Sequence, residues 1–308
     1  MSTIEKLQHQ LGTAGDESIL RTLARPPTVF MIPLTVLLVF MFIGPILSIV
    51  LYSMMPSNAL SLNPATWTVA NYAEIIGGVI DGTGVYGEVM SNTVLISVAT
   101  TLATLVFSYP AAYALARKIK RFKLLFLLAL IVPLFTSVNI RVFGWVLFLV
   151  KRGVLQSLLG QFGIATPSLL YQEWTIILGT TYVYMPFMLF PIYLSIGAIS
   201  DETFEAARDL GASRYMLFRD IVLPMSKPGI IIGCLFVFVL SLGAEVEALL
   251  LGGGSIYTAA NNISYSFGYS QNWPLGSAQA VGLLIITVIA GIVILRTIDL
   301  REIASRGS

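Results

Sequence analysis

The sequence is poor in the residues that bind metal ions and form disulfides. Cys234 is the only cysteine and His9 the only histidine among the 308 residues. One cysteine cannot close an intramolecular disulfide, and one imidazole with one distant thiol cannot supply the ligands of a zinc or iron site. We therefore expect neither a disulfide scaffold nor a metal centre in this chain.

Charged residues are also scarce. They make up 11% of the chain, whereas hydrophobic residues make up 56%. Soluble domains typically contain about 25% charged residues, so the chain is not expected to be a soluble globular protein. The net charge of +2 is spread in short runs between apolar stretches and forms no single basic patch, which argues against a nucleic-acid partner.

The sequence contains six long apolar segments instead. A bilayer core of about 30 Å is crossed by about 20 helical residues, and each segment has at least that length. The segments are 29–53, 89–116, 124–150, 174–199, 229–251 and 279–298. They predict an all-α polytopic membrane protein with six transmembrane helices. The transmembrane domain would cover 29–298, between an N-terminal tail (1–28) and a C-terminal tail (299–308).

The distribution of basic residues predicts the orientation of these segments. Fifteen of the 18 lysines and arginines fall in the two tails and in the loops that follow the second and fourth segments. The opposite side has only Lys151 and Arg152. Because basic residues near the ends of spans favour the cytoplasmic side, we expect both termini to be cytoplasmic.

Small residues mark the last two segments. They would let neighbouring helices approach closely inside the membrane. These residues are Gly229, Gly233, Gly243, Gly282, Ala290 and Gly291.

The cytoplasmic loop between the fourth and fifth segments predicts two short helices. Ser200 or Asp201 can cap the first helix, and Gly211 stands where a left-handed residue would end it. The second helix can begin at Ser213 and is expected to stop at Pro224. These residues alone leave two interpretations open: helices that rest on the membrane or on their own bundle, and a projection that docks on another protein.

Seven residues of this loop match the EAA signature, E-A-A-x3-G-x9-I-x-L-P, of permease subunits of bacterial ABC importers. They are Glu205, Ala206, Ala207, Gly211, Ile221, Leu223 and Pro224. The chain resembles this family from about Asn92 to Trp273, and it is most similar to the spermidine/putrescine type through segments such as Tyr184-Met185-Pro186-Phe187. The resemblance implies the type I ABC importer permease (MetI-like) fold and a multi-pass location in the bacterial inner membrane.

The same resemblance implies a set of partners. The loop at about 200–224 would be a coupling helix seated in a groove of a cytoplasmic ABC ATPase dimer, which would bind the ATP and magnesium. This chain would then be no enzyme and would carry no cofactor and no catalytic residue, in agreement with the lack of a G-x4-G-K-[ST] phosphate loop. The other implied partners are a second, distinct permease subunit, a periplasmic substrate-binding protein and membrane lipid.

Three charged residues lie inside the apolar segments, away from their predicted cytoplasmic ends. They are Arg141, Glu245 and Glu247. Charges inside a membrane are costly and are functional candidates by default. Residues two apart on a helix point about 200° apart, so the two glutamates can face one cavity only if the helix unwinds near Gly243. Alternatively, Arg141 forms a purely structural pair with either glutamate.

The glutamates suggest a cationic solute, a polyamine or another amine-bearing compound. Tyr182 and Tyr184 of the fourth segment are further candidates for the substrate pathway, although such residues also serve as ordinary packing. The sequence departs from the polyamine type at Ala244 and Glu245, where an aspartate and an aromatic residue are usual, and at Asn272, where an aspartate is common.

Other functions stay open beside the polyamine importer. The chain could be an ABC permease for an organic anion, a phosphonate or iron, or an ion-coupled secondary transporter that needs no ATPase. A membrane-embedded enzyme is disfavoured because no carboxylate pair shares a helical face and no histidine and cysteine pair is available.

Overall fold

The computed structural model describes residues 26–57, 63–82, 84–119, 121–164 and 167–296. The C-terminal tail predicted at 299–308 lies outside the described residues, as does the predicted N-terminal tail apart from 26–28. The described part of the chain is helical and has no strand, as the all-α prediction requires. Six of its helices are long and apolar enough to cross a membrane.

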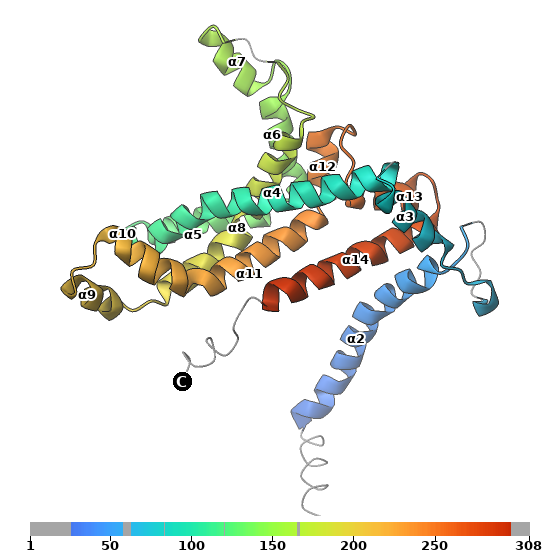
Figure 1. The fold of residues 1–308 in the computed structure, drawn as a ribbon, viewed down its shortest axis with the longest axis horizontal. Helices are drawn as coiled ribbons and strands as arrows, with labels where there is room; N and C mark the ends of the chain where they lie inside the picture. Colours follow the sequence, from blue (N-terminus) through green and yellow to red (C-terminus); the bar gives the residue numbers. More distant parts are fainter. Residues whose placement is uncertain (1–25, 58–62, 83, 120, 165–166, 297–308) are drawn as a thin grey trace, which may run out of the picture.

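Three helices form the centre of the molecule. Helices α4 (Val85–Tyr113), α8 (Glu173–Gly197) and α11 (Leu223–Leu242) pack against one another, and α14 (Trp273–Arg296) lies beside α11 (Figure 1). Helix α8 carries many of the buried apolar side chains, because it is covered by α4 on one side and α11 on another. The core of the bundle is therefore built around the fourth predicted span.

Glycines on α11 set the distance to α8. A Cβ atom at Gly229 would stand 2.4 Å from the Pro191 carbonyl oxygen, and one at Gly233 would stand 3.0 Å from the Met188 carbonyl oxygen. The predicted close contact is confirmed at these two positions. It is wrong for Gly282, where a Cβ would meet no atom within 4 Å.

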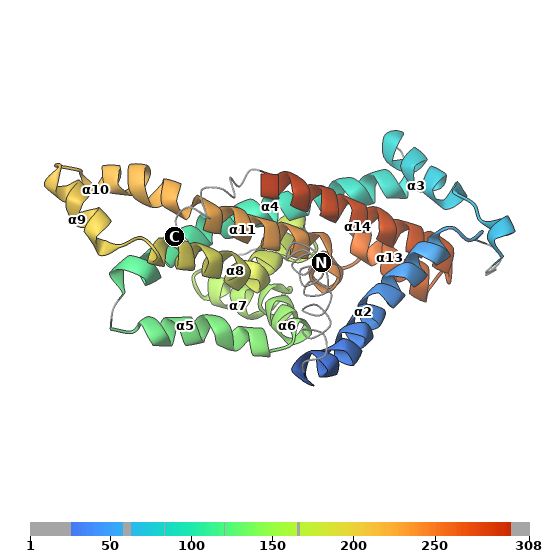
Figure 2. The ribbon, with the colours of Figure 1, turned by 90° about the horizontal axis from the view of Figure 1, so that it is seen from below.

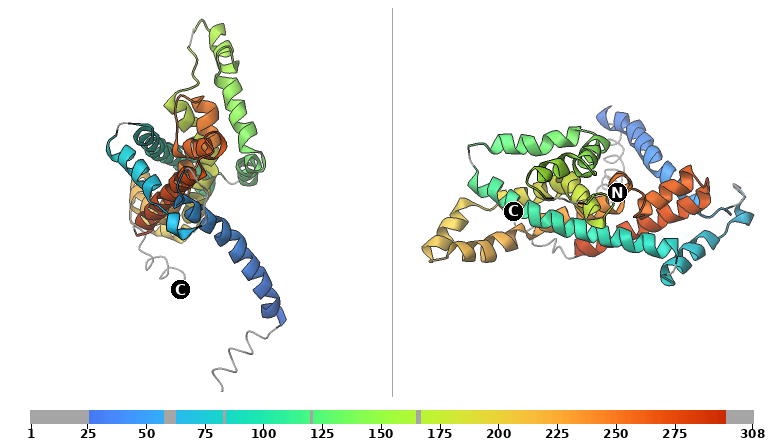
Figure 3. Two further views of the ribbon diagram at one scale, coloured as in Figure 1. Left: turned by 90° about the vertical axis from the view of Figure 1, so that its right-hand side faces the viewer. Right: turned by 90° about the horizontal axis from the view of Figure 1, so that it is seen from above.

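Helix α2 (Pro26–Ser53) diverges from the bundle (Figures 1 and 3). It packs on α14, and near its C-terminal end the rings of Tyr52 and Trp273 lie 6.2 Å apart. Its apolar side chains from Met31 to Ile43 are exposed. The first predicted span is thus present as a helix, but most of its surface is left to lipid or to other chains.

The third predicted span, 124–150, is wrong as one continuous helix. The segment forms α5 (Lys123–Ile131), a 3-10 turn (Val132–Phe135) and α6 (Val138–Leu149). Pro133 provides no N–H for an α-helical bond, and Thr136 and Ser137 adopt extended backbone conformations that turn the chain. Helix α6 then leaves the direction of α5 (Figure 2), and the third apolar stretch of sufficient length is Val138–Gln161.

The fifth predicted span, 229–251, ends early. Helix α11 stops at Leu242, the chain bends at Gly243 and Ala244, and α12 (Glu245–Gly252) follows as a separate helix. The two glutamates were expected to face one cavity only if the helix unwinds near Gly243, and this interruption is present. The two glutamates begin a new helix and are not part of the long one.

Candidate functional site

The loop between the fourth and fifth spans projects at one end of the bundle (Figures 1 and 2). It contains α9 (Asp201–Asp209), α10 (Arg214–Met216) and a π turn (Leu217–Val222) that continues directly into α11. We call residues 200–222 the coupling unit. Helices α3 (Ala70–Ile80) and α13 (Ala259–Gly268) lie at the opposite end of the bundle (Figure 2).

The predicted starts of both short helices and the predicted end of the first are confirmed. The Ser200 hydroxyl accepts a hydrogen bond from the backbone N–H of Thr203 at 3.4 Å. The Ser213 hydroxyl accepts one from the N–H of Met216 at 3.3 Å. Gly211 follows α9 with a φ of +84°, a conformation that glycine adopts without the cost of about 1 kcal/mol paid by a residue with a Cβ.

The predicted helix stop at Pro224 is wrong. The helix that starts after Ser213 runs through the π turn and Pro224 into α11 without interruption. A π turn hydrogen-bonds over five residues instead of four, and this change in register accommodates a proline that lacks an N–H. The second half of the coupling unit is consequently one body with the fifth span.

The coupling unit exposes apolar side chains at its tip. Leu210 is 90% exposed, Tyr215 68% and Met216 52%. Of the signature residues, Glu205 and Ala206 are exposed as well, whereas Ala207 and Ile221 pack against the core of the bundle. One side of the unit is thus fixed to the bundle and the other is free of this chain.

Arg117, in the π segment Ala114–Lys118 at the end of α4, contacts the coupling unit. Its Nη1 donates to Asp201 Oδ1 at 2.8 Å, and its Nη2 donates to the carbonyls of Ile196 and Ile199. Its guanidinium carbon lies 4.3 Å from the centroid of the Phe204 ring. One side chain therefore joins α4 to the end of α8 and to the start of α9.

Phe218 of the π turn makes a second contact with α4. Its ring packs edge-on against Tyr109 at 5.8 Å and against Tyr113 at 6.0 Å. The Tyr109 hydroxyl lies 3.0 Å from the hydroxyl of Ser226 on α11. Both halves of the coupling unit therefore contact the C-terminal end of α4, which is the end predicted to be cytoplasmic.

The structure brings together three of the five predicted pathway residues. Glu247 of α12 is 3% exposed, and the Tyr184 hydroxyl of α8 lies close enough to its carboxylate to interact with it. Arg141 of α6 is close enough to act electrostatically on both. Among the described residues no ion pair within 4 Å joins Arg141 to either glutamate, and its Nε is buried without a hydrogen-bond partner.

The other two pathway candidates lie apart from this cluster. Tyr182 is partly exposed and its ring packs against Trp145 with centroids 5.8 Å apart. Glu245 is half-buried, and its backbone carbonyl accepts a hydrogen bond from Asn261 Nδ2 at 3.0 Å. Even with α11 interrupted, the two glutamates do not share an environment.

These features agree with comparisons with known proteins. Residues 82–301 match the family described as the inner membrane component of binding-protein-dependent transport systems. The chain belongs to this family. This family description is that of a transport component and not of an enzyme, and it places this importer permease in the inner membrane as a multi-pass protein.

Curated relatives of this permease cover most of its length. It is 33% identical over 261 residues to the spermidine/putrescine transport system permease protein PotB of Escherichia coli (strain K12), with 84% of this chain and 91% of that protein covered. It is 32% identical over 251 residues to PotB of Haemophilus influenzae, with 81% and 86% covered.

A solved structure supports the permease fold. A chain of a bacterial alginate ABC transporter, crystallised in complex with an alginate pentasaccharide-bound periplasmic protein, superposes with a TM-score of 0.70. The match covers 89% of this permease and 94% of that chain at 15% identity. The predicted all-α, six-span importer permease fold is confirmed.

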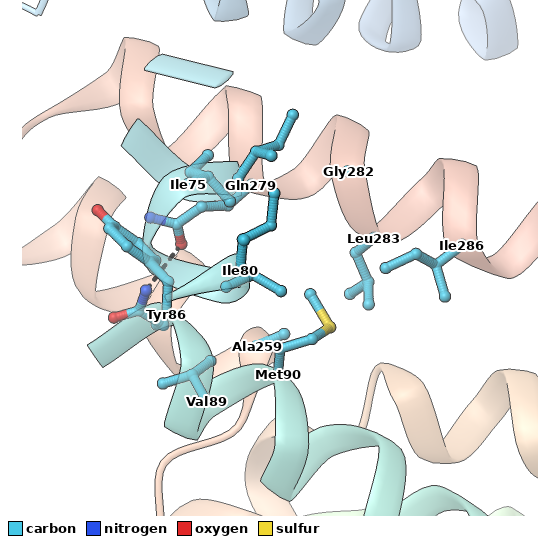
Figure 4. A pocket seen from close by; sticks show the side chains of 13 residues that line it. Ile75, Ile80, Tyr86, Val89, Met90, Ala259, Gln279, Gly282, Leu283 and Ile286 are labelled. Atoms are coloured by element: carbon cyan, nitrogen blue, oxygen red, sulfur yellow. Dashed lines mark hydrogen bonds between the residues drawn. The ribbon is translucent and has the colours of Figure 1, made fainter. Parts of the chain in front are cut away.

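A cavity of about 240 Å³ lies elsewhere in the permease, between α3, α4, α13 and α14. Its lining is almost entirely apolar, with Leu283 and Ile286 toward one end and Tyr86 and Gln279 toward the other (Figure 4). None of the pathway candidates lines this cavity. It is therefore distinct from the cluster of Arg141, Tyr184 and Glu247.

Arg117 was not predicted from the sequence as a residue of the site. It was one of the five basic residues between the second and third segments, and these were used only to orient the chain. Its position as the first basic residue after the apolar stretch of the second span was the available signal. Which of the five turns toward the coupling unit depends on the π segment at Ala114–Lys118, which the sequence pattern does not reveal.

Proposed function

We propose that this permease is one half of the translocation pathway of an ABC importer. The pathway opens alternately to the two sides of the membrane as ATPase subunits bound to the coupling unit bind and hydrolyse ATP. The observation that carries the proposal is the two-sided coupling unit. Leu210, Tyr215 and Met216 are free for a partner, while the opposite side is held by α4 and runs into the fifth span.

The EAA residues have distinct roles in this proposal. Glu205 and Ala206 face the ATPase, with the Glu205 carboxylate available for a basic group and the small Ala206 allowing close approach. Gly211 turns the chain between the two short helices. Ala207 and Ile221 seat the unit on the bundle, and Leu223-Pro224 joins it to α11.

The remaining partners follow from the same function. A second, distinct permease subunit completes the pathway, an ATPase dimer supplies ATP and magnesium, and a periplasmic binding protein delivers the solute. Both termini lie in the cytoplasm, on the side of the coupling unit. The alginate transporter bound to its periplasmic protein supports this assembly by analogy of fold.

The proposed solute is a polyamine. The PotB relatives are permeases of spermidine/putrescine systems, and Glu247 provides a buried carboxylate beside Tyr184. A carboxylate in a low-dielectric environment attracts an ammonium group more strongly than one in water. Arg141 partly balances the carboxylate when no solute is bound, and Tyr182 lines the path farther from the charge.

The coupling role is tested with the whole complex in proteoliposomes. Glu205→Ala and Gly211→Asp are expected to reduce association with the ATPase and to lower ATP-driven uptake by about tenfold, the effect of losing about 1.4 kcal/mol. Glu202→Ala is the matched control, because Glu202 is exposed on the same helix outside the signature. Uptake that continues without any ATPase would contradict the proposal and identify a secondary transporter.

The solute is tested by charge removal. Glu247→Gln is expected to lower spermidine uptake by about tenfold through the loss of one charge–charge interaction of about 1.4 kcal/mol. Glu245→Gln is expected to have a smaller effect because Glu245 lies outside the cluster. Unchanged uptake in both single variants and in the double variant would eliminate the glutamates from the pathway.

A further inference from the structure

We propose that Arg117 is the positioning residue that fixes the angle of the coupling unit, so that α4, the end of α8 and α9 move as one body. This inference rests on the proposed function, because Arg117 would transmit the motion of the ATPase from the coupling unit to the spans. Arg117 does not touch the ATPase or the solute in this role. It acts through α9.

The contacts of Arg117 are directional and come from α9 and from the C-terminal end of α8 with the residues that follow it. The side chain is only 16% exposed, although it stands at the end of the bundle. One nitrogen bonds the Asp201 carboxylate, and the other bonds the carbonyl oxygens of Ile196, at 3.0 Å, and Ile199. The Ile196 carbonyl lies in the last turn of α8 and the Ile199 carbonyl two residues beyond its end at Gly197, where the helix dipole favours a positive charge.

The geometry requires an arginine. The guanidinium is planar, so it presents its edge to the carboxylate and the carbonyls while its face covers the Phe204 ring at 4.3 Å. A lysine at this position could keep one charged contact, but its single ammonium cannot make the two-sided set of bonds and the stacking contact together. Asp201 is 90% exposed, so water solvates its carboxylate and it does not need Arg117 as a partner. The bond between the two residues therefore serves to position α9.

The other attachment of the coupling unit is different in kind. Phe218 packs edge-on against Tyr109 and Tyr113, and these ring contacts hold the π turn near α4 without a charged hydrogen bond. The ion pair Arg219–Asp220 lies within the coupling unit and does not cross to the bundle. Among the described residues, Arg117 therefore makes the one charged contact between the unit and α4.

The test measures coupling and not only uptake. In proteoliposomes with the complete complex and the loaded binding protein, Arg117→Ala is expected to lower solute uptake per ATP hydrolysed by about tenfold, because more than one charge-assisted hydrogen bond is lost. Arg117→Lys is expected to restore part of this ratio. Lys118→Ala is the control, since Lys118 is exposed and contacts the ring of Tyr113 on its own helix.

A second measurement reports the position of α9 directly. The protein for this measurement carries Cys234→Ala, which removes the only cysteine. Spin labels are then attached at two exposed positions, Leu102→Cys on α4 and Asp209→Cys on α9. With Arg117 present we expect one narrow distance distribution, the same without nucleotide and with ATP trapped. With Arg117→Ala or Asp201→Asn we expect the distribution to broaden.

The outcomes separate this inference from the proposed function. An unchanged uptake-to-hydrolysis ratio in Arg117→Ala, or an unchanged distance distribution, overturns the role of Arg117 while ATP-driven uptake by the unmodified complex still supports the importer. If Arg117→Ala does not assemble, the Asp201→Asn and Arg117→Lys variants decide the question by the same two measurements. Uptake by the unmodified chain that needs no ATPase overturns both.

Discussion

At the scale of single residues, the lack of a side chain at Gly229 allows α11 and α8 to pack closely. Gly229 brings α11 so close to α8 that its Cα faces the Pro191 carbonyl and the Ser195 hydroxyl directly. In a membrane no hydrophobic driving force brings helices together, because lipid tails are as apolar as the side chains. Helix association therefore depends on close packing of this kind. The same residue is therefore part of the packing that holds the two helices joined by the coupling unit.

Gly229→Val should destabilise the folded permease. The added Cβ would lie 2.4 Å from both the Pro191 carbonyl oxygen and the Ser195 Oγ, and overpacking of this kind costs about 1–3 kcal/mol. The half-buried Cys234 allows the measurement, since a thiol-reactive dye labels it faster as the bundle opens on heating. Gly291→Ala is the control, because its Cβ would meet Leu235 at an ordinary 3.8 Å. Equal melting temperatures for the two variants would contradict the packing argument.

At the scale of helices, the α4–α8 contact contains hydroxyl groups as well as apolar side chains. Thr100 and Thr180 lie hydroxyl to hydroxyl at 2.7 Å, and Thr180 also donates to the Ile176 carbonyl at 2.8 Å. Thr101 and Thr104, which are also buried on α4, bond only a carbonyl of their own helix. The pair is thus a specific link between two spans.

Replacing Thr100 and Thr180 by valine, singly and together, should reveal a modest coupling energy. We expect about 0.6 kcal/mol between the two sites, the usual size of such bonds inside membranes. The unfolding free energies of the four proteins give this value in a double-mutant cycle. A parallel cycle with Thr101→Val and Thr180→Val should give none, and an equal value in both cycles would refute a specific bond.

The sequence predicted the helices better than their breaks. Hydrophobic length located six spans, and the capping residues Ser200 and Ser213 located both helix starts in the coupling unit. Hydropathy contains no information on backbone direction, so the bend after Pro133 was not predicted and the interruption near Gly243 was considered only as a condition. Pro224 was misjudged because a proline ends an α-helix, whereas a change to a π turn lets the helix continue.

The candidate site was predictable to the extent that it depends on local sequence. The EAA signature identified the coupling unit, since its residues are close together along the chain. Arg117 lies 84 residues from Asp201, and their contact depends on how α4 and α8 pack. The partners of Glu247 likewise come from two other helices, which no spacing rule could select.

At the scale of the whole molecule, the two ends of the bundle differ in character. The coupling unit and the basic loop after α4 lie at one end, and α3 and α13 lie at the other (Figure 2). Basic residues gather on the cytoplasmic side of membrane proteins. The arrangement in space is thus consistent with the orientation that the charges predict.

This orientation can be measured by labelling single cysteines in intact cells. In a Cys234→Ala background, a membrane-impermeant maleimide should modify Tyr257→Cys, because Tyr257 is exposed at the predicted outer end. Arg121→Cys, in the basic loop, should react only after the membrane is opened. The reverse pattern would invert the topology and remove the coupling unit from the cytoplasm.

The helix from Arg214 to Leu242 contains 29 residues and is about 43 Å long at 1.5 Å per residue. It has no loop between Arg214 and Leu242, so under the proposed function a tilt at one end would be carried to the other. The first hinge it meets is the bend at Gly243 and Ala244. Under the proposed function, a tilt of the coupling unit would reach a point three residues before Glu247, where a change of angle would alter the surroundings of its carboxylate.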